Sequence, residues 1–216
     1  MKLKSATAIE QFLRKHGLSY ISEPYWKDWR RVNIYEAVAP DILHQLYQGL
    51  IRHLTAWCRT IFGDDELDAR FSRVPPTFGL RRFENGISKL QRPSGAEHRA
   101  VAKQLQTCIA SAGVDKRIVR ATKAILDFTV MAQYECHSDD TLEDLTDAVD
   151  RWHKNKEVFK ELGALVAGFN FPKMHSMQHY NPSIKLFGIL PTLSTDIGER
   201  LHIVQVKDAY NASNKK

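Results

Sequence analysis

The sequence predicts a mainly α-helical fold, and three observations support this prediction. Apolar residues recur at spacings of three and four along most of the 216-residue chain, which is the period of a helix with one buried face. Strand-like patterns are confined to two short segments, 32–38 and 184–187. The composition, 43% hydrophobic and 26% charged, excludes collagen-like, low-complexity and wholly disordered chains.

Six successive segments of the chain show the helical period, and each is expected to form a helix. They cover residues 5–16, 41–62, 96–112, 115–134, 139–162 and 196–212. The segment 41–62 has one continuous apolar stripe, which includes Leu46, Leu50 and Leu54. Gly63 and Gly163 follow two of these segments, and glycine is the usual residue just past a helix end.

The two strand-like segments predict at most a small sheet. Residues 32–38 read VNIYEAV and lead through Pro40 into the helix that begins at Asp41. Residues 184–187 read IKLF and are the second candidate. We therefore expect helices to dominate, with one or two short strands.

The charge pattern permits binding to a polyanion without requiring it. Lysine and arginine outnumber the acids, giving a formal net charge of +6. Lys116, Arg117, Arg120 and Lys123 cluster on one predicted helix, where they can contact DNA phosphates. The alternative is an ordinary solvated helix face.

Cysteine and hydropathy patterns exclude several protein classes. Cys58, Cys108 and Cys136 are far apart, which argues against a disulfide framework and a cysteine-built zinc site, so we interpret them as small buried apolar residues. No apolar run approaches the roughly 18 residues that cross a bilayer. The first residues lack the pattern of a secretory signal, which favours an intracellular protein.

Asp41 is the first candidate for chemistry, since no phosphate-binding glycine loop, GxSxG motif or CxxC pair is present. It follows a predicted strand and opens a helix, a position where nuclease acids hold a divalent cation. The same position suits a plain helix N-cap. His44, one turn later, can reach the same ligand.

Glu199 is the second candidate acid, on the last predicted helix. His202 lies three residues later and shares its face. A helix-borne Glu facing a strand-end Asp provides the hard oxygen ligands that two Mg²⁺ ions need in a phosphodiester site. The alternative is a surface Glu in a first helical turn.

His175 and His179 form an HxxxH pair that can lie on one helical face. Zinc proteases need a Glu directly after the first His, and Ser176 stands there instead. The pair either packs and hydrogen-bonds within the fold or contacts a metal or phosphate.

Several blocks of the chain together resemble the Plavaka-type transposases of fungi, in the CACTA-like group. The blocks are VNIYEAVAPDILHQLYQG, GISKLQRPSGAEHR, RIVRATKAILDFTVMAQY, WHKNKEVFKELG, FPKMHSMQHYNPSIKLFG and ERLHIVQVKDAYNASN. The resemblance implies a DDE recombinase with an RNase H-like core, in which two Asp and one Glu bind two Mg²⁺ or Mn²⁺ ions and DNA is cut and joined. Asp41 then matches the second acid and Glu199 the third. The HxxxH pair matches an element that recurs in the group.

The resemblance also implies a division of the chain and a missing acid. Residues 1–63 would hold a remnant of the core with the Asp41 helix, 64–171 a helical bundle-like insertion, and 172–216 the HxxxH segment with the Glu199 helix. The first catalytic Asp has no match. A hairpin of strands plus a helix needs on the order of 50 residues ahead of the second acid, and only 40 residues precede Asp41. We therefore expect the C-terminal part of a catalytic region, inactive alone.

The resemblance carries expectations about partners and place. It implies DNA as partner, a nuclear location, no membrane, and either the missing catalytic portion supplied in trans or self-association. Whether the chain is an enzyme is left open. The alternative function is a non-catalytic helical module that binds DNA or protein.

Overall fold

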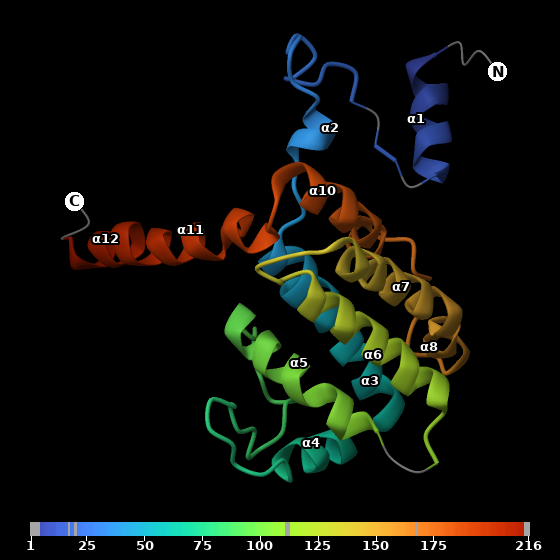
Figure 1. Cartoon of the computed structure of the whole chain (residues 1–216), viewed down its shortest axis with the longest axis vertical. Helices are drawn as coiled ribbons and strands as arrows, with labels where there is room; N and C mark the ends of the chain where they lie inside the picture. The colour runs from blue at the N-terminus through green and yellow to red at the C-terminus, as the bar shows by residue number, and fades with distance from the viewer. Residues whose placement is uncertain (1–4, 17, 20, 111–112, 167, 214–216) are drawn as a thin grey trace.

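The structure, a computed structural model, describes residues 5–16, 18–19, 21–110, 113–166 and 168–213 (Figure 1). All regular secondary structure in these ranges is helical, with no strand, so the predicted mainly α fold is confirmed. None of the helices in these ranges is long and apolar enough to span a bilayer.

A bundle of helices forms the body of the protein. In chain order it contains η1 (Ile42–Ile51), α3 (Arg52–Phe62), α4 (Asp64–Ser72), α5 (Gly95–Ile109), α6 (Lys116–Met131), α7 (Asp139–Asn155), α8 (Glu157–Glu161), α9 (Pro172–His175), η2 (Ser176–His179) and α10 (Tyr180–Phe187). The π-helical η1 runs directly into α3, and both contact α5, while α6 and α7 pack side by side along most of their length (Figure 1). The predicted helix 41–62 is therefore confirmed as one continuous rod at the centre of the bundle.

Further helices lie at the two ends of the chain. They are α1 (Ala6–Lys15) and α2 (Ile34–Ala37) before the bundle, and η3 (Leu190–Leu193), α11 (Thr195–His202), η4 (Ile203–Asp208) and α12 (Ala209–Ala212) after it. The last three join into one rod that projects from the bundle, and they contain no buried residue (Figure 1). The predicted helix 196–212 is confirmed as this rod.

Local sequence explains where the bundle helices begin and end. Ser94 and Glu97 form a reciprocal capping box at the start of α5, and Ser138 caps α7. Gly63 and Gly163 adopt φ of +79° and +74°, a conformation that glycine reaches at little cost. The predicted helix 139–162 is split at Lys156 into α7 and α8. The predicted end of 96–112 lies partly outside the described residues, at 111–112.

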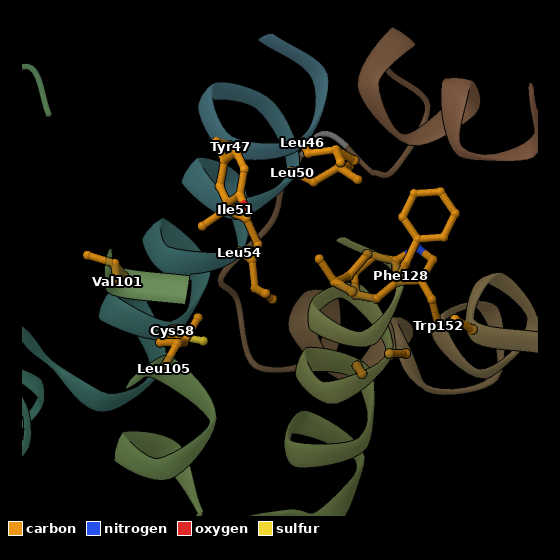
Figure 2. Packing of buried hydrophobic residues seen from close by; sticks show 14 of the residues in the cluster. Leu46, Tyr47, Leu50, Ile51, Leu54, Cys58, Val101, Leu105, Phe128 and Trp152 are labelled. Atoms are coloured by element: carbon orange, nitrogen blue, oxygen red, sulfur yellow. The ribbon is translucent and has the colours of Figure 1, made fainter. Parts of the chain in front are cut away.

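The core is one apolar cluster that contains residues from all parts of the bundle. Leu46, Leu50 and Leu54 of the central rod point into the same interior as Phe128 of α6 and Trp152 of α7 (Figure 2). Their recurrence every three to four residues in the sequence is the reason the rod is helical and buried. The cluster draws residues from 1–63, 64–171 and 172–216 alike, and the proposed division into these three segments stays a prediction.

The two predicted strands are wrong. Residues 34–37 form α2, because the side chain of Asn33 accepts a hydrogen bond from the backbone of Tyr35 and so begins a helical turn. Residues 184–187 belong to α10, where Tyr180 and Ile184 are buried one turn apart. A short β-prone segment stays a strand only when a second strand pairs with it. Neither segment has such a partner in the described chain, and an RNase H-like remnant stays a prediction.

Two of the three cysteines agree with the sequence-based interpretation. Cys58 and Cys108 are buried, and burial raises the pKa of their thiols to about 12 and about 11 respectively. Cys136 is exposed, so its assignment as a buried residue is wrong. The exposed position follows from its place in the turn after α6, outside the apolar period of that helix.

Gly86 holds the loop between α4 and α5, and replacing it by Ala is expected to destabilise the fold. It has a φ of +73°, and a Cβ there would clash with the side chain of Asp68. Asp68 accepts hydrogen bonds from the backbone of Ile87 and Ser88, which the clash would disturb. We expect Gly86→Ala to lower the free energy of unfolding by about 2–4 kcal/mol, from strain plus weakened hydrogen bonds.

Gly79→Ala is the matched control for this prediction. Gly79 also has a φ of +73°, but a Cβ there meets nothing within 4 Å. Its cost should be the backbone strain alone, about 1–2 kcal/mol. Urea unfolding of both variants checks the difference, and equal losses would show that the Asp68 contact contributes nothing.

Candidate functional site

Asp41 lies at the start of η1, where it caps the helix. Its backbone is extended, and its Oδ2 accepts a hydrogen bond from the backbone N–H of His44 at 2.7 Å. The N-cap interpretation left open by the sequence is therefore realised. The side chain is only 17% exposed, so the carboxylate is held in one place by the surrounding chain.

The second oxygen of Asp41 joins η1 to the C-terminal rod. Asp41 Oδ1 accepts a hydrogen bond from the backbone N–H of Thr195 at 2.8 Å, and Thr195 is the first residue of α11. The hydroxyl Oγ1 of Thr195 lies 3.0 Å from Nδ1 of His44. One carboxylate thus fixes the ends of two helices that are far apart in the sequence.

His44 lies between the two candidate acids. Its Nδ1 is 2.7 Å from Asp41 Oδ2, and its Nε2 is 2.8 Å from Glu199 Oε1. We call these three residues the acid–histidine bridge. The two carboxylates are separated by the two hydrogen bonds and one imidazole ring, at most about 8 Å. The structure therefore brings Asp41 and Glu199 to one side of the molecule.

Hydrogen bonding decides the direction in which the pKa of Asp41 shifts. Burial alone would raise the pKa of Asp41, but hydrogen bonds from Thr195 and His44 outweigh it and lower that pKa below its ordinary value. Since a carboxylate oxygen faces each nitrogen of His44, the ring donates to both only when it carries both protons.

Arg99 of α5 provides a second tie to the base of α11. Its guanidinium lies 3.6 Å from Asp196 and 4.8 Å from the centre of the Tyr47 ring. Both groups on this ion pair are about half exposed, so solvent weakens it. The start of α11 is therefore held mainly by the Asp41 and His44 contacts, and the described residues of the rod beyond Glu199 are exposed.

The donor set of the bridge suits a single hard cation better than two. Mg²⁺ binds through one or two carboxylates and completes its octahedron with water. Across the ranges that the structure describes, no three His, Cys, Asp or Glu side chains are grouped so that they could hold a metal ion. Asp41 and Glu199 could bind one ion together only if His44 moves out from between them.

The paired histidines make none of the contacts of the bridge. His175 closes α9 and His179 closes η2, and their Nε2 atoms are 3.1 Å apart. The side-chain amide of Gln178 is 2.7 Å from Nδ1 of His175. Both histidines are exposed, and among the described residues their side chains contact each other and Gln178. His202 is exposed on α11, one turn beyond Glu199, and makes none of the contacts of the bridge.

The basic cluster on α6 is partly neutralised by neighbouring acids. Arg117 pairs with Asp115 and Glu161, each at 2.8 Å. Lys123 pairs with Asp127 at 2.7 Å. Lys116 and Arg120 are exposed and form no ion pair with the described residues. The predicted DNA-binding face thus offers fewer free charges than its sequence suggests.

Sequence reasoning missed Thr195 and Arg99 as parts of this region. The run Ser194–Thr195–Asp196 carries a helix-start signal, because the hydroxyl of Ser194 accepts from the backbone of Asp196. That signal could have placed the helix end, although not its contact with Asp41. The tie to Arg99 depends on how α5 packs and has no local signal.

Comparison with known proteins supports the resemblance for part of the chain. Residues 2–58 match the family model described as Plavaka transposase. The matched region contains Asp41 and His44 but not Glu199. Comparisons with curated proteins and with solved structures found no match. The resemblance to Plavaka-type transposases is therefore confirmed over the N-terminal part, and the place of this chain within a catalytic region stays a prediction.

Proposed function

We propose that this chain is a remnant of a DDE-type transposase. In this proposal Asp41 and Glu199 are surviving metal-ligand positions of a site that ancestrally cut transposon ends and transferred strands, in the nucleus, with two Mg²⁺ or Mn²⁺ ions. One observation carries the proposal. Asp41, inside the family match, and Glu199, far outside it, meet on the two sides of His44.

Each residue of the bridge has a defined task in this proposal. Asp41 and Glu199 supply the oxygen ligands, and the backbone of Thr195 fixes Asp41. His44 lies between the two acids, and a cation that binds both would have to take its place. A bound Mg²⁺ would activate water and stabilise the leaving oxygen at a phosphodiester.

The proposal includes that the chain does not cut DNA on its own. A two-metal site needs several carboxylates to hold both ions at the required spacing. The bridge offers two carboxylates, those of Asp41 and Glu199. The nearby carboxylate of Asp196 pairs with Arg99 at 3.6 Å instead. A further carboxylate would have to come from outside this site, either from a further catalytic portion or from a second copy of the chain.

The alternative function, a non-catalytic helical DNA-binding or interaction module, has less support. It relied on the basic cluster of α6, where Arg117 and Lys123 already pair with acids. A basic side chain that already forms an ion pair with an acid contributes less net charge to binding a phosphate.

Manganese binding tests the ligand assignment. We expect the chain to bind about one Mn²⁺ weakly, with a dissociation constant on the order of 10⁻³ M, when the free-ion EPR signal is titrated. Asp41→Asn and Glu199→Gln should each weaken binding roughly tenfold or more. Asp208→Asn, an exposed acid further along the same rod, is the control and should change nothing.

Two results would contradict the proposal in different ways. Equal Mn²⁺ binding by the wild type and Asp41→Asn would show that the bridge is not the metal site. Plasmid nicking by the isolated chain, abolished in Asp41→Asn, would instead keep the metal site and overturn the prediction of inactivity.

A further inference from the structure

A groove of about 580 Å³ lies between the N-terminal segment and α10. Tyr25, Trp26 and Tyr35 line one wall, and His179, Ser183 and Leu186 line the other. Figure 1 shows how this arises, because α2 and the chain around it stand beside α10 at one end of the bundle.

The walls of the groove present aromatic faces to solvent. Tyr35 is 84% exposed and Tyr25 is 74% exposed. Tyr25 also makes edge contacts with Trp26 and Trp29, at centroid distances of 4.7 and 5.5 Å, which hold its ring in place. Aromatic rings held open in this way are stacking platforms, and every nucleobase has a flat face that can stack on them.

Polar groups inside the groove favour a base over an apolar peptide side chain. Gln45 lines the groove, and its Oε1 accepts a hydrogen bond from Tyr180 at 3.4 Å, which leaves its amide N–H groups as donors. The hydroxyl of Ser183 has no hydrogen-bond partner among the described residues. A base edge offers both donors and acceptors to such groups, whereas an apolar side chain would leave them unsatisfied.

Charges beside the groove suit a phosphate backbone. Arg30 and Arg31 are exposed in the loop between Trp26 and α2, and neither forms an ion pair with the described residues. Lys185, between Ser183 and Leu186 on α10, is likewise exposed and without an ion pair in the described chain. Glu36 lines the groove and Asp28 is exposed in the same loop as the two arginines, so outside the Glu23–Lys27 ion pair these segments carry three basic residues and two acids.

The groove also adjoins the acid–histidine bridge along the chain. Pro40 and Gln45 line it, and Asp41 and His44 lie directly between them. We propose that this groove binds an unpaired base of single-stranded DNA. The proposal rests on the proposed function for DNA as the ligand, although not on metal binding.

Fluorescence anisotropy with short labelled oligonucleotides tests the proposal. The probes are a thymidine single strand and an abasic strand of equal length and charge, in buffer with EDTA. We expect the chain to bind the thymidine strand at least about fivefold more tightly than the abasic strand. The Tyr25→Ala/Tyr35→Ala double variant should lose that preference, and Arg30→Gln/Arg31→Gln should weaken both probes equally.

Phe78→Ala is the matched control, because Phe78 is a fully exposed aromatic residue that does not line the groove. It should bind both probes as the wild type does. Tyr25→Phe/Tyr35→Phe keeps the stacking faces and should retain the preference for thymidine. Matching circular dichroism and thermal melting would exclude unfolding as the cause of any loss.

Two outcomes would overturn the proposal. Equal affinity of the wild type for the thymidine and abasic strands would mean that no base is read. A preference that survives in the double variant would place the base elsewhere on the molecule. If manganese binding fails while the base preference persists in EDTA, the metal proposal falls and this one stands.

Discussion

Replacing Trp152 by Ala is expected to lower the free energy of unfolding by about 3–5 kcal/mol. Trp152 is 1% exposed and lies nearly parallel to Trp57, with ring centroids 6.0 Å apart. Phe159 and Phe169 contact the same ring, at 5.9 and 5.5 Å. Removing the indole leaves a cavity that these neighbours cannot fill, and the total stability of a domain is only about 5–15 kcal/mol.

Urea unfolding followed by far-ultraviolet circular dichroism checks this prediction, since tryptophan fluorescence changes with the substitution itself. Trp29→Ala is the control, because Trp29 is 48% exposed and should cost about 1 kcal/mol or less. Trp152→Phe retains most of the ring and provides a measurement if the alanine variant does not fold. A loss below about 1 kcal/mol in Trp152→Ala would mean that the aromatic cluster is loosely packed.

The helices could be predicted because their apolar period and their caps are local signals. Leu46, Leu50 and Leu54 recur along one face, and all three are buried in the central rod. Ser94 and Ser138 precede their helices and cap them as their side-chain chemistry suggests. The break at Lys156 carried no such signal, because neither Gly nor Pro marks it.

The strands failed because β-propensity describes a surface and not an isolated segment. Residues 32–38 are rich in β-branched and apolar residues, yet no partner strand lies in the described chain to accept their backbone groups. Asn33 then decides the local structure by starting a helical turn. The pattern of residues 32–38 therefore predicted a strand for a segment that folds without one.

Sequence patterns singled out Asp41, His44 and Glu199, whose metal-binding role stays a prediction, but not the further contacts of Asp41. Asp41 and Glu199 were chosen from their positions at helix starts and from the resemblance, and the structure brings both to His44. The tie through Thr195 depends on the packing of α11 against η1, which no local pattern encodes. The groove between α2 and α10 likewise arises only when distant segments meet.

Replacing Asp41 by Ala should release the C-terminal rod from the bundle as well as weaken the central helix. The substitution removes an N-cap, the hydrogen bond to Thr195 and the contact with His44. We expect a loss of about 2–3 kcal/mol, the sum of a cap and one further charged hydrogen bond. Since α11 has no buried residue, amide exchange across Thr195–His202 should become fast while the bundle stays protected.

The effect of Asp41→Ala should also depend on pH in one direction. The pKa of Asp41 is lowered in the folded chain, so its stabilisation is fully present above the ordinary carboxyl pKa of about 4 and is lost as the pH falls through the folded value. Wild type and variant should therefore differ most near neutral pH and converge in acid.

Asp196→Ala is the control for this last prediction, because Asp196 lies on the same helix and makes only a half-exposed ion pair with Arg99. It should cost about 1 kcal/mol or less and leave amide exchange in α11 nearly unchanged. If Asp196→Ala loosened α11 as much as Asp41→Ala does, the rod would be held by Arg99 and not by the bridge. Glu199 would then have no fixed relation to Asp41, and the two acids could not share a cation.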